Sequence, residues 1–339
     1  MSVAKALVVA HETGEEARLL GLGFRTPALM PLANKPVLVH ALERMSAAGI
    51  EDVGVVVGRS TRNDVCSAIE EANGLRLAIE YLDAPAGASV VDAVLAAAAF
   101  VGDDPLLVQE GDALVRADLR ALEELFSGAS LDALGLRLTP SSFRRRSPVD
   151  HEPPLLARLG ACFLSRGSLR VAAEPGSELA SLIARVRDGG GRVEVEHVDG
   201  CLPCHGGRET LLDANRRALD DLAEERVEAQ LHDCELQGPV VVHPSARLEA
   251  TLVRGPVVIG PRTEITHSYI GPYTSLGADV VIEGAEVENS LVLDGARIRY
   301  LGARLEGSVV GRDARIGRDH RLPHAVRLLV AERAEVTLA

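Results

Sequence analysis

The last third of the chain repeats an aliphatic residue about every six positions, with glycine and small polar residues in between. The spacing stays between five and seven residues over fourteen positions: Val242, Leu248, Val253, Ile259, Ile265, Ile270, Leu276, Ile282, Val287, Val292, Ile298, Leu305, Val310 and Ile316. Such a repeat is typical of a parallel β-helix, whose coils stack aliphatic corners on one another. The low aromatic content, with no Trp, five Phe and four Tyr, suits narrow aliphatic cores. We therefore expect a left-handed hexapeptide-repeat β-helix, capped by residues 319–339.

The first 130 residues follow a different pattern, in which short aliphatic runs alternate with amphipathic stretches. The aliphatic runs are 4–10, 53–58, 76–82 and 105–109, and the amphipathic stretches are 36–49, 62–73 and 89–101. Strands that alternate with helices of this length predict a largely parallel sheet with helices on both faces. Ligands of such sheets bind beyond the carboxyl ends of the strands, so the loops after Ala10 and Gln109 are the first places to look.

These two patterns predict two domains, as the length of 339 residues also suggests. The first is an α/β domain over residues 1–235, which ends in a linking helix at about 208–229. The second is the β-helix with its C-terminal cap, over residues 236–339.

Composition excludes several classes of function. A net charge of −13 argues against nucleic-acid binding, which requires a basic surface. The longest apolar run, 90–101, is too short to span a membrane. Residues 1–10 contain no cleavage signal, so we expect a cytoplasmic protein whose five cysteines are reduced.

The stretch "GCLPCHGG" at 200–207 contains Cys201, Cys204 and His205 in the C-x-x-C-H spacing of a c-type haem attachment site. The same residue types also bind zinc or carry redox chemistry. The motif alone leaves these alternatives open.

Four other stretches resemble the sugar-1-phosphate nucleotidyltransferases, and most of all the long form of glucose-1-phosphate thymidylyltransferase from antibiotic-sugar pathways. They are 28–58, 100–115, 211–216 and 254–278, so that the resemblance extends over most of the chain. It implies a nucleotidyltransferase-type parallel or mixed sheet flanked by helices and followed by a left-handed parallel β-helix. It also implies transfer of a nucleotidyl group to a sugar phosphate, with magnesium and release of pyrophosphate.

The loop after the first strand departs from the family pattern A-G-G-x-G-T-R-L. His11 and Glu12 stand at the two adjacent glycines, Gly14 is kept, and Glu16 stands at the arginine. Glycines are needed there because backbone N–H groups must approach the phosphates closely. A glutamate carboxylate in this loop would also repel a phosphate. At ~4 Å such a pair of negative charges costs roughly 4 kcal/mol at an effective dielectric constant near 20. This loop is therefore not suited to a triphosphate.

The lysines that the resemblance implies are also missing. The chain contains only Lys5 and Lys35, and Pro27 stands at the catalytic lysine position. Leu82 replaces the glutamine that reads the base in the family. Arginine does not simply substitute for lysine at a tight phosphate site.

One of the two magnesium ligands of the family is retained. Asp112 matches the first, although a strand-terminating Gly-Asp turn explains it equally well. We take Gly14, Gly87, Gly111 and Asp112 as the candidate substrate-binding residues. Cys204 stands at the second aspartate position, so magnesium is expected only if nucleotidyl transfer survives.

The same alignment places "GCLPCHGG" in the fold. It runs without a gap up to the linking helix, with Cys201 at a tryptophan position and His205 at a threonine position. A c-type haem is therefore rejected, because the segment has a structural role. Zinc remains open, with Cys201, Cys204 and His205 joined by His11 or Asp112, a ligand set softer than magnesium prefers.

Several functions remain open on these grounds. We favour a non-catalytic homologue that binds a nucleotide sugar or another small molecule, as a homo-oligomer or a hetero-oligomer with a catalytic relative. One alternative is a repurposed enzyme whose cleft uses candidates from the set His11, Glu12, Glu16, Asp112, Cys201, Cys204 and His205. Another is a divergent but active nucleotidyltransferase, and the last is acyl transfer in the β-helix with His267 as base.

Overall fold

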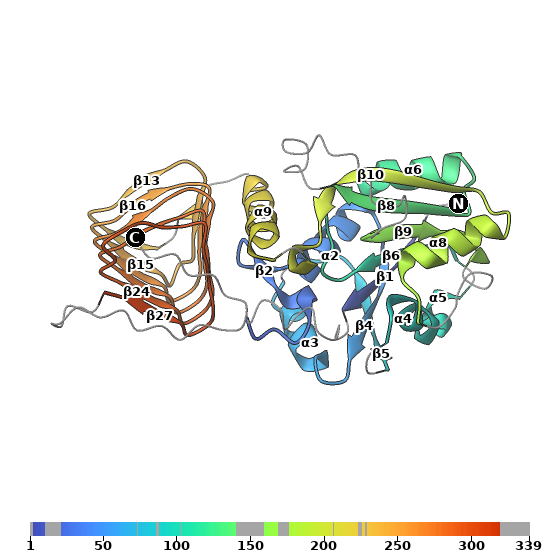
Figure 1. Ribbon diagram of the computed structural model, residues 1–339, viewed down its shortest axis with the longest axis horizontal. Coiled ribbons are helices and arrows are strands. Elements are labelled where there is room, and N and C mark those ends of the chain that lie inside the picture. Colours follow the sequence, from blue (N-terminus) through green and yellow to red (C-terminus); the bar gives the residue numbers. More distant parts are fainter. Residues whose placement is uncertain are drawn as a thin grey trace. The chain divides into compact units, whose positions relative to one another are not determined.

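The computed structural model of the chain describes residues 3–10, 22–72, 74–85, 88–102, 104–139, 159–168, 176–205, 207–222, 226–227 and 229–318 (Figure 1). For residues 205, 226 and 227 it describes the backbone alone. The chain divides into two compact units. The first holds the described residues of 3–10 and 24–214, and the second holds residues 22–23 and those from Asn215 onward.

In the described part of the first unit, an eight-stranded mixed sheet has the order β5-β4-β1-β6-β9-β8-β10-β7. Its strands are β1 (Lys5–Ala10), β4 (Asp52–Gly58), β5 (Ala78–Ala84), β6 (Leu106–Glu110), β7 (Leu114–Val115), β8 (Ala133–Thr139), β9 (Ala161–Leu164) and β10 (Val193–Cys201). Strands β5, β4, β1 and β6 run parallel, whereas β9 is antiparallel to both of its neighbours. A short hairpin of β2 (Pro31–Leu32) and β3 (Lys35–Pro36) precedes the first long helix.

Helices cover both faces of this sheet (Figure 1). They are α2 (Val37–Ala48), α3 (Arg62–Glu70), α4 (Val90–Ala96), α5 (Ala98–Val101), α6 (Leu119–Gly128) and α8 (Leu179–Asp188), with 3₁₀ turns η1 (Pro27–Leu29) and η3 (Pro203–His205). One apolar core joins Leu42 and Phe126, from α2 and α6, to the sheet. The other joins Val94 and Leu182, from α4 and α8, to the opposite face. The stretch 89–101, expected as one helix, is interrupted at Ala97 between α4 and α5.

The second unit is a left-handed parallel β-helix built from three sheets. The first contains β11 (Arg226–Val227), β14 (Val240–Val242), β17 (Val257–Ile259), β20 (Thr274–Leu276), β23 (Leu291–Val292) and β26 (Val309–Val310). The second contains β12 (Gln230–His232), β15 (Arg247–Glu249), β18 (Glu264–Thr266), β21 (Val281–Glu283), β24 (Arg297–Arg299) and β27 (Arg315–Gly317). The third contains β13 (Glu235–Gln237), β16 (Leu252–Arg254), β19 (Tyr269–Ile270), β22 (Glu286–Glu288) and β25 (Leu305–Glu306).

The aliphatic repeat of the sequence sets this architecture. All fourteen repeat positions lie in these strands, and equivalent positions pair from coil to coil, as Leu248 with Ile265 and Ile265 with Ile282. Twelve of these fourteen side chains are buried in the core, and the other two, Leu305 and Ile316 near its C-terminal end, are partly exposed. The fold class expected from the sequence is confirmed in both units.

The linking helix differs from its expected length. Helix α9 (Gly207–Asp220) ends well before residue 229, because Arg226–Val227 pairs with β14 as a first β-helix strand. The domain boundary at 235 stays a prediction, since α9 begins in one unit and ends in the other. Within the described residues, none of the helices is both long and apolar enough to cross a membrane.

Candidate functional site

The carboxyl ends of β1 and β6 lie side by side, as the sequence pattern predicts. Val9 is the register partner of Glu110, and the next residue, Gly111, donates its N–H to the carbonyl oxygen of Val9 at 2.8 Å. A Cβ atom at Gly111 would lie 2.7 Å from that oxygen and 3.1 Å from the Cβ of Ala28. Backbone packing alone therefore requires glycine at this position, whether or not a ligand binds there.

A closed turn after β6 positions Asp112. The N–H of Ala113 donates to the carbonyl of Glu110 at 2.9 Å, and the side-chain amide of Gln109 donates to the carbonyl of Ala113 at 2.9 Å. Asp112, at the centre of this turn, is only 7% exposed. A buried carboxylate at the carboxyl edge of a sheet is suited to ligand binding. The turn needs no ligand to form, however.

The two cysteines of the GCLPCHGG stretch lie at the same edge. Cys201 is the last residue of β10 and is the register partner of Leu114 in β7. Leu114 follows Asp112 by two residues. Gly200 precedes it because a Cβ there would lie 2.4 Å from the carbonyl oxygen of Leu114. Cys204 follows on η3, and both thiols are buried, with 2% and 4% exposure. The topology thus places Cys201 and Asp112 at the same edge of the sheet, and the pairing of Cys204 with Asp112 that the alignment implies stays a prediction.

This donor set does not fit a magnesium site. Magnesium prefers oxygen ligands in octahedral geometry, whereas the family pattern predicts the thiol of Cys204 at the position of the second carboxylate. Among the described residues, no three His, Cys, Asp or Glu side chains come together in a way that could hold a metal ion. The side chains of His11 and His205 lie outside the described residues, so the zinc site stays a prediction.

The other sequence candidates also lie outside the described residues: His11, Glu12, Gly14, Glu16 and Gly87. Ala10, which precedes the first four of them in the chain, ends β1 beside β4 and β6. Thr26, fully buried, donates its hydroxyl to the carbonyl of Ala10 at 3.2 Å and caps η1 by accepting from the N–H of Ala28. Sequence analysis missed Thr26, although the Thr-Pro pair before η1 is a signal for a helix start.

Both lysines of the chain form ion pairs with carboxylates. The ammonium of Lys5 lies 2.9 Å from Asp104 and also donates to the carbonyl of Phe100 at 3.3 Å. The ammonium of Lys35 donates to both oxygens of Glu43, at 2.7 and 2.8 Å. Lys5 begins β1, so it stands at the end of the strand opposite to the candidate site.

Near Lys35, His40 on α2 has its Nε2 atom 3.0 Å from the carbonyl oxygen of Leu32 in the β2–β3 hairpin. Burial is the main cause that lowers the pKa of His40 below its ordinary value, and it outweighs the hydrogen bond with Leu32, which raises the pKa. His40 is therefore neutral at pH 7 and fixes the hairpin to the helix.

Comparison with known proteins gives results in agreement with the fold. The family model described as nucleotidyl transferase matches residues 11–137. A glucose-1-phosphate thymidylyltransferase of Streptomyces griseus is 32% identical over 99% of both chains. The low-salt glycan biosynthesis nucleotidyltransferase Agl11 of Haloferax volcanii is 30% identical over 91% of this chain and 93% of its own. The structure of a Bacillus anthracis protein assigned as a glucose-1-phosphate thymidylyltransferase superposes with a TM-score of 0.53 at 17% identity, over 66% of this chain and 97% of that one.

Fold and site together define a nucleotidyltransferase-type α/β domain joined to a left-handed β-helix. With full-length similarity to the curated relatives, the chain belongs to the sugar-1-phosphate nucleotidyltransferase family.

Proposed function

We propose that this chain is a sugar-nucleotidyltransferase homologue that does not carry out ordinary nucleotidyl transfer and acts by binding. It binds a nucleotide sugar or a related small molecule, and it assembles with copies of itself or with a catalytic relative. The observation that supports this most is the state of the two lysines. Lys5 pairs with Asp104 and Lys35 pairs with Glu43, so that each ammonium already has a carboxylate partner.

The charge of the loop after Ala10 supports the same proposal. Glu12, Glu15 and Glu16 occupy a loop that in the resembling family approaches the triphosphate. Each carboxylate within ~4 Å of a phosphate would cost roughly 4 kcal/mol at an effective dielectric constant near 20. A nucleotide sugar carries fewer charges than a magnesium-free triphosphate, so the same loop penalises it less.

Calorimetric titration and a turnover assay test this proposal. We expect no heat of binding from dTTP without magnesium, and no pyrophosphate release from dTTP, magnesium and glucose 1-phosphate at protein concentrations where a catalytic family member turns over readily. dTDP-glucose titrated without magnesium is the matched ligand, and binding is expected there. Pyrophosphate release that depends on the added sugar phosphate would refute the proposal and identify a divergent transferase.

A regulatory role is tested with a catalytic relative from the same organism. We expect the two proteins to co-purify and the turnover rate of the relative to change when this chain is added. A Cys204→Ala variant should act like the wild type in this assay, since a binding partner does not use the buried thiol. Absence of both complex formation and rate change would refute regulation while leaving ligand binding untouched.

One observation favours a second candidate, a repurposed site. The buried thiols of Cys201 and Cys204 share an edge of the sheet with Asp112, and thiols suit zinc far better than magnesium. Elemental analysis of the purified chain tests this candidate. Stoichiometric zinc that is lost in Cys204→Ala would establish a metal site, and its absence from the wild type would exclude one.

A further inference from the structure

Two outward faces of the β-helix differ sharply in how they are covered. On the sheet that contains β20, Ser275 points outward between the core positions and is nevertheless fully buried. Its hydroxyl donates to the side-chain oxygen of Asn215 at 2.8 Å, and Arg216 lies 4.2 Å from the ring of Tyr273. The C-terminal end of α9 therefore covers this sheet.

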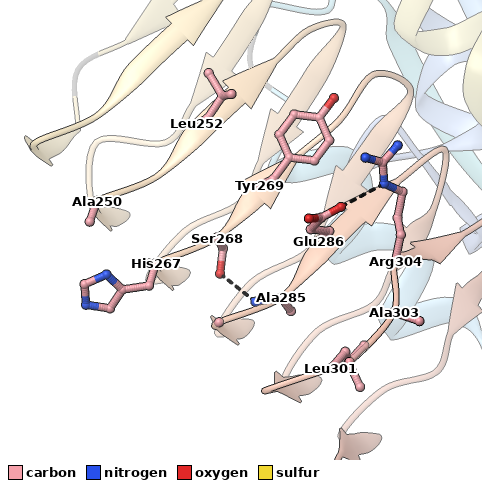
Figure 2. A pocket seen from close by; sticks show the side chains of 12 residues that line it. Ala250, Leu252, His267, Ser268, Tyr269, Ala285, Glu286, Leu301, Ala303 and Arg304 are labelled. Atoms are coloured by element: carbon pink, nitrogen blue, oxygen red, sulfur yellow. Dashed lines mark hydrogen bonds and ion pairs between the residues drawn. The ribbon is translucent and has the colours of Figure 1, made fainter.

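The outward side chains of the sheet of β13, β16, β19, β22 and β25 are exposed or half-buried in the described chain. We call its outward side chains the open face: Glu235, Gln237, Leu252, Arg254, Tyr269, Glu286, Glu288, Arg304 and Glu306. The face is hollowed by a groove of about 760 Å³, shown in Figure 2. The stretch 301–304 forms one rim of the groove, and five residues link β24 to β25 where two link β21 to β22 in the preceding coil.

The open face contains two columns of side chains in coil-to-coil register. From the first coil to the last, the rows are Glu235/Gln237, Leu252/Arg254, Tyr269/Gly271, Glu286/Glu288 and Arg304/Glu306. Arg304 donates to Glu286 at 3.0 Å and to Glu288 at 2.9 Å. The half-buried ring of Tyr269 lies between the two guanidinium groups, 6.0 Å from that of Arg254 and 5.3 Å from that of Arg304.

We propose that the open face is the contact surface of a homodimer in which a second copy packs face to face with its β-helix antiparallel. The two-fold axis runs along the strand direction at the level of Tyr269. Such a rotation keeps each column opposite itself and reverses the order of the rows. Arg254 then faces Glu288 of the second copy, and Glu235 faces Arg304 of the second copy. Tyr269 meets its own equivalent beside Gly271, which leaves room for the two rings.

A parallel arrangement of the same faces gains less from charge. With the axis along the β-helix, each column would face the other column of the same row. Glu286 would then face Glu288 of the second copy and Arg304 would face Glu306, each twice, so that repulsion offsets attraction. The antiparallel arrangement has opposite charges in two pairs of rows and no like charges opposite each other.

The charge distribution along the whole β-helix agrees with the antiparallel arrangement. Residues 230–288 contain eight carboxylates and three arginines, whereas residues 291–318 contain three carboxylates and six arginines. Two such β-helices side by side in opposite directions place acidic coils against basic coils. The five strands of the open face span only about 19 Å at ~4.8 Å per strand, so we expect a micromolar dimer rather than a tight one.

Sedimentation equilibrium of the full chain between 1 and 200 µM tests this proposal. We expect a monomer–dimer equilibrium in the wild type. Arg254→Glu and Glu288→Arg should each raise the dissociation constant by about tenfold or more, because each change places like charges at two symmetric contacts. Mixing the two variants should restore the dimer, since residue 254 of one chain again faces an opposite charge at residue 288 of the other.

The matched control is Arg247→Glu, an equal charge change in the same coil on a different sheet, which should leave the dissociation constant unchanged. Circular dichroism of each variant verifies that the fold is intact. A wild type that stays monomeric at 200 µM would overturn the proposal, and so would a trimer. Failure of the mixed variants to pair would overturn the antiparallel arrangement. None of these outcomes depends on whether the chain binds nucleotides.

Discussion

Strand β1 and the turn after β6 approach each other closely at Gly111, and this contact allows a quantitative prediction. In a Gly111→Ala variant the new Cβ would lie 2.7 Å from the carbonyl oxygen of Val9, which also accepts the N–H of Gly111. Because a backbone atom of a central strand stands in the way, either the strand or the turn must move. Such overpacking in a tightly packed interior costs typically about 1–3 kcal/mol. We expect the free energy of unfolding of the α/β unit to fall by this amount.

Gly128→Ala is the matched control for this prediction. Gly128 is the exposed last residue of α6, and a Cβ there would meet nothing within 4 Å. The same chemical change should therefore stabilise the unit by about 0.5–1 kcal/mol, since alanine restricts the unfolded chain and favours the helix.

Far-UV circular dichroism during thermal unfolding is the suitable assay, because the described helices up to α8 all belong to the α/β unit. For a unit of about 200 residues, each kcal/mol shifts the midpoint by about 2–4 °C. The two glycine variants should therefore move the midpoint in opposite directions. An unchanged midpoint for Gly111→Ala would show that β6 relaxes freely at this edge, and the steric argument would be wrong.

Three further substitutions test other contacts. The pKa of His40 is lowered by burial, so the unfolded chain binds its proton more readily and stability is lost as pH falls through the ordinary value near 6.5. His40→Gln, which can still donate to Leu32, should flatten the dependence of unfolding free energy on pH between 7 and 5; an unchanged slope would exclude His40 as its source. Asn215→Ala should cost about 1–3 kcal/mol by leaving the buried hydroxyl of Ser275 without its acceptor, as urea unfolding would measure, whereas a neutral result would mean that α9 is held by apolar contacts alone. Ile265→Ala, in the middle of the β-helix core, should cost about 2–5 kcal/mol, and a loss below 1 kcal/mol would indicate that the coils collapse into the space.

The fold was predictable from the sequence because both of its periodicities are local. An inner aliphatic residue such as Ile265 needs only its own coil and the next to be buried, so a spacing of six residues predicts its position. The end of α9 was not predictable in this way. Leu219 and Leu222 continue the amphipathic pattern, but the pairing of β11 with β14 ends the helix, and that pairing depends on residues further along the chain.

The candidate site was predictable in position more than in detail. The alternation of strands and helices places the loops after Ala10 and Gln109 at one edge, where the structure also has Asp112 and Cys201. The partners of the two lysines could not be read from the sequence, because Asp104 and Glu43 are each one of many carboxylates in an acidic chain. The tertiary structure determines which carboxylate pairs with each lysine.

The position of Lys5 limits what any movement of side chains could contribute to phosphate chemistry. Lys5 and Ala10 are separated by five residue steps of β1, about 16 Å at ~3.3 Å per residue. An extended lysine side chain reaches only about 6 Å from its Cα atom at ordinary bond lengths. Since β1 is a central strand of the sheet, Lys5 stays far from the loop that begins after Ala10. Lys35 would have to give up both hydrogen bonds to Glu43 to serve in its place. Nucleotidyl transfer by this chain would therefore need Lys35 released from Glu43, or arginine, which forms planar paired contacts where the family pattern uses a compact ammonium charge.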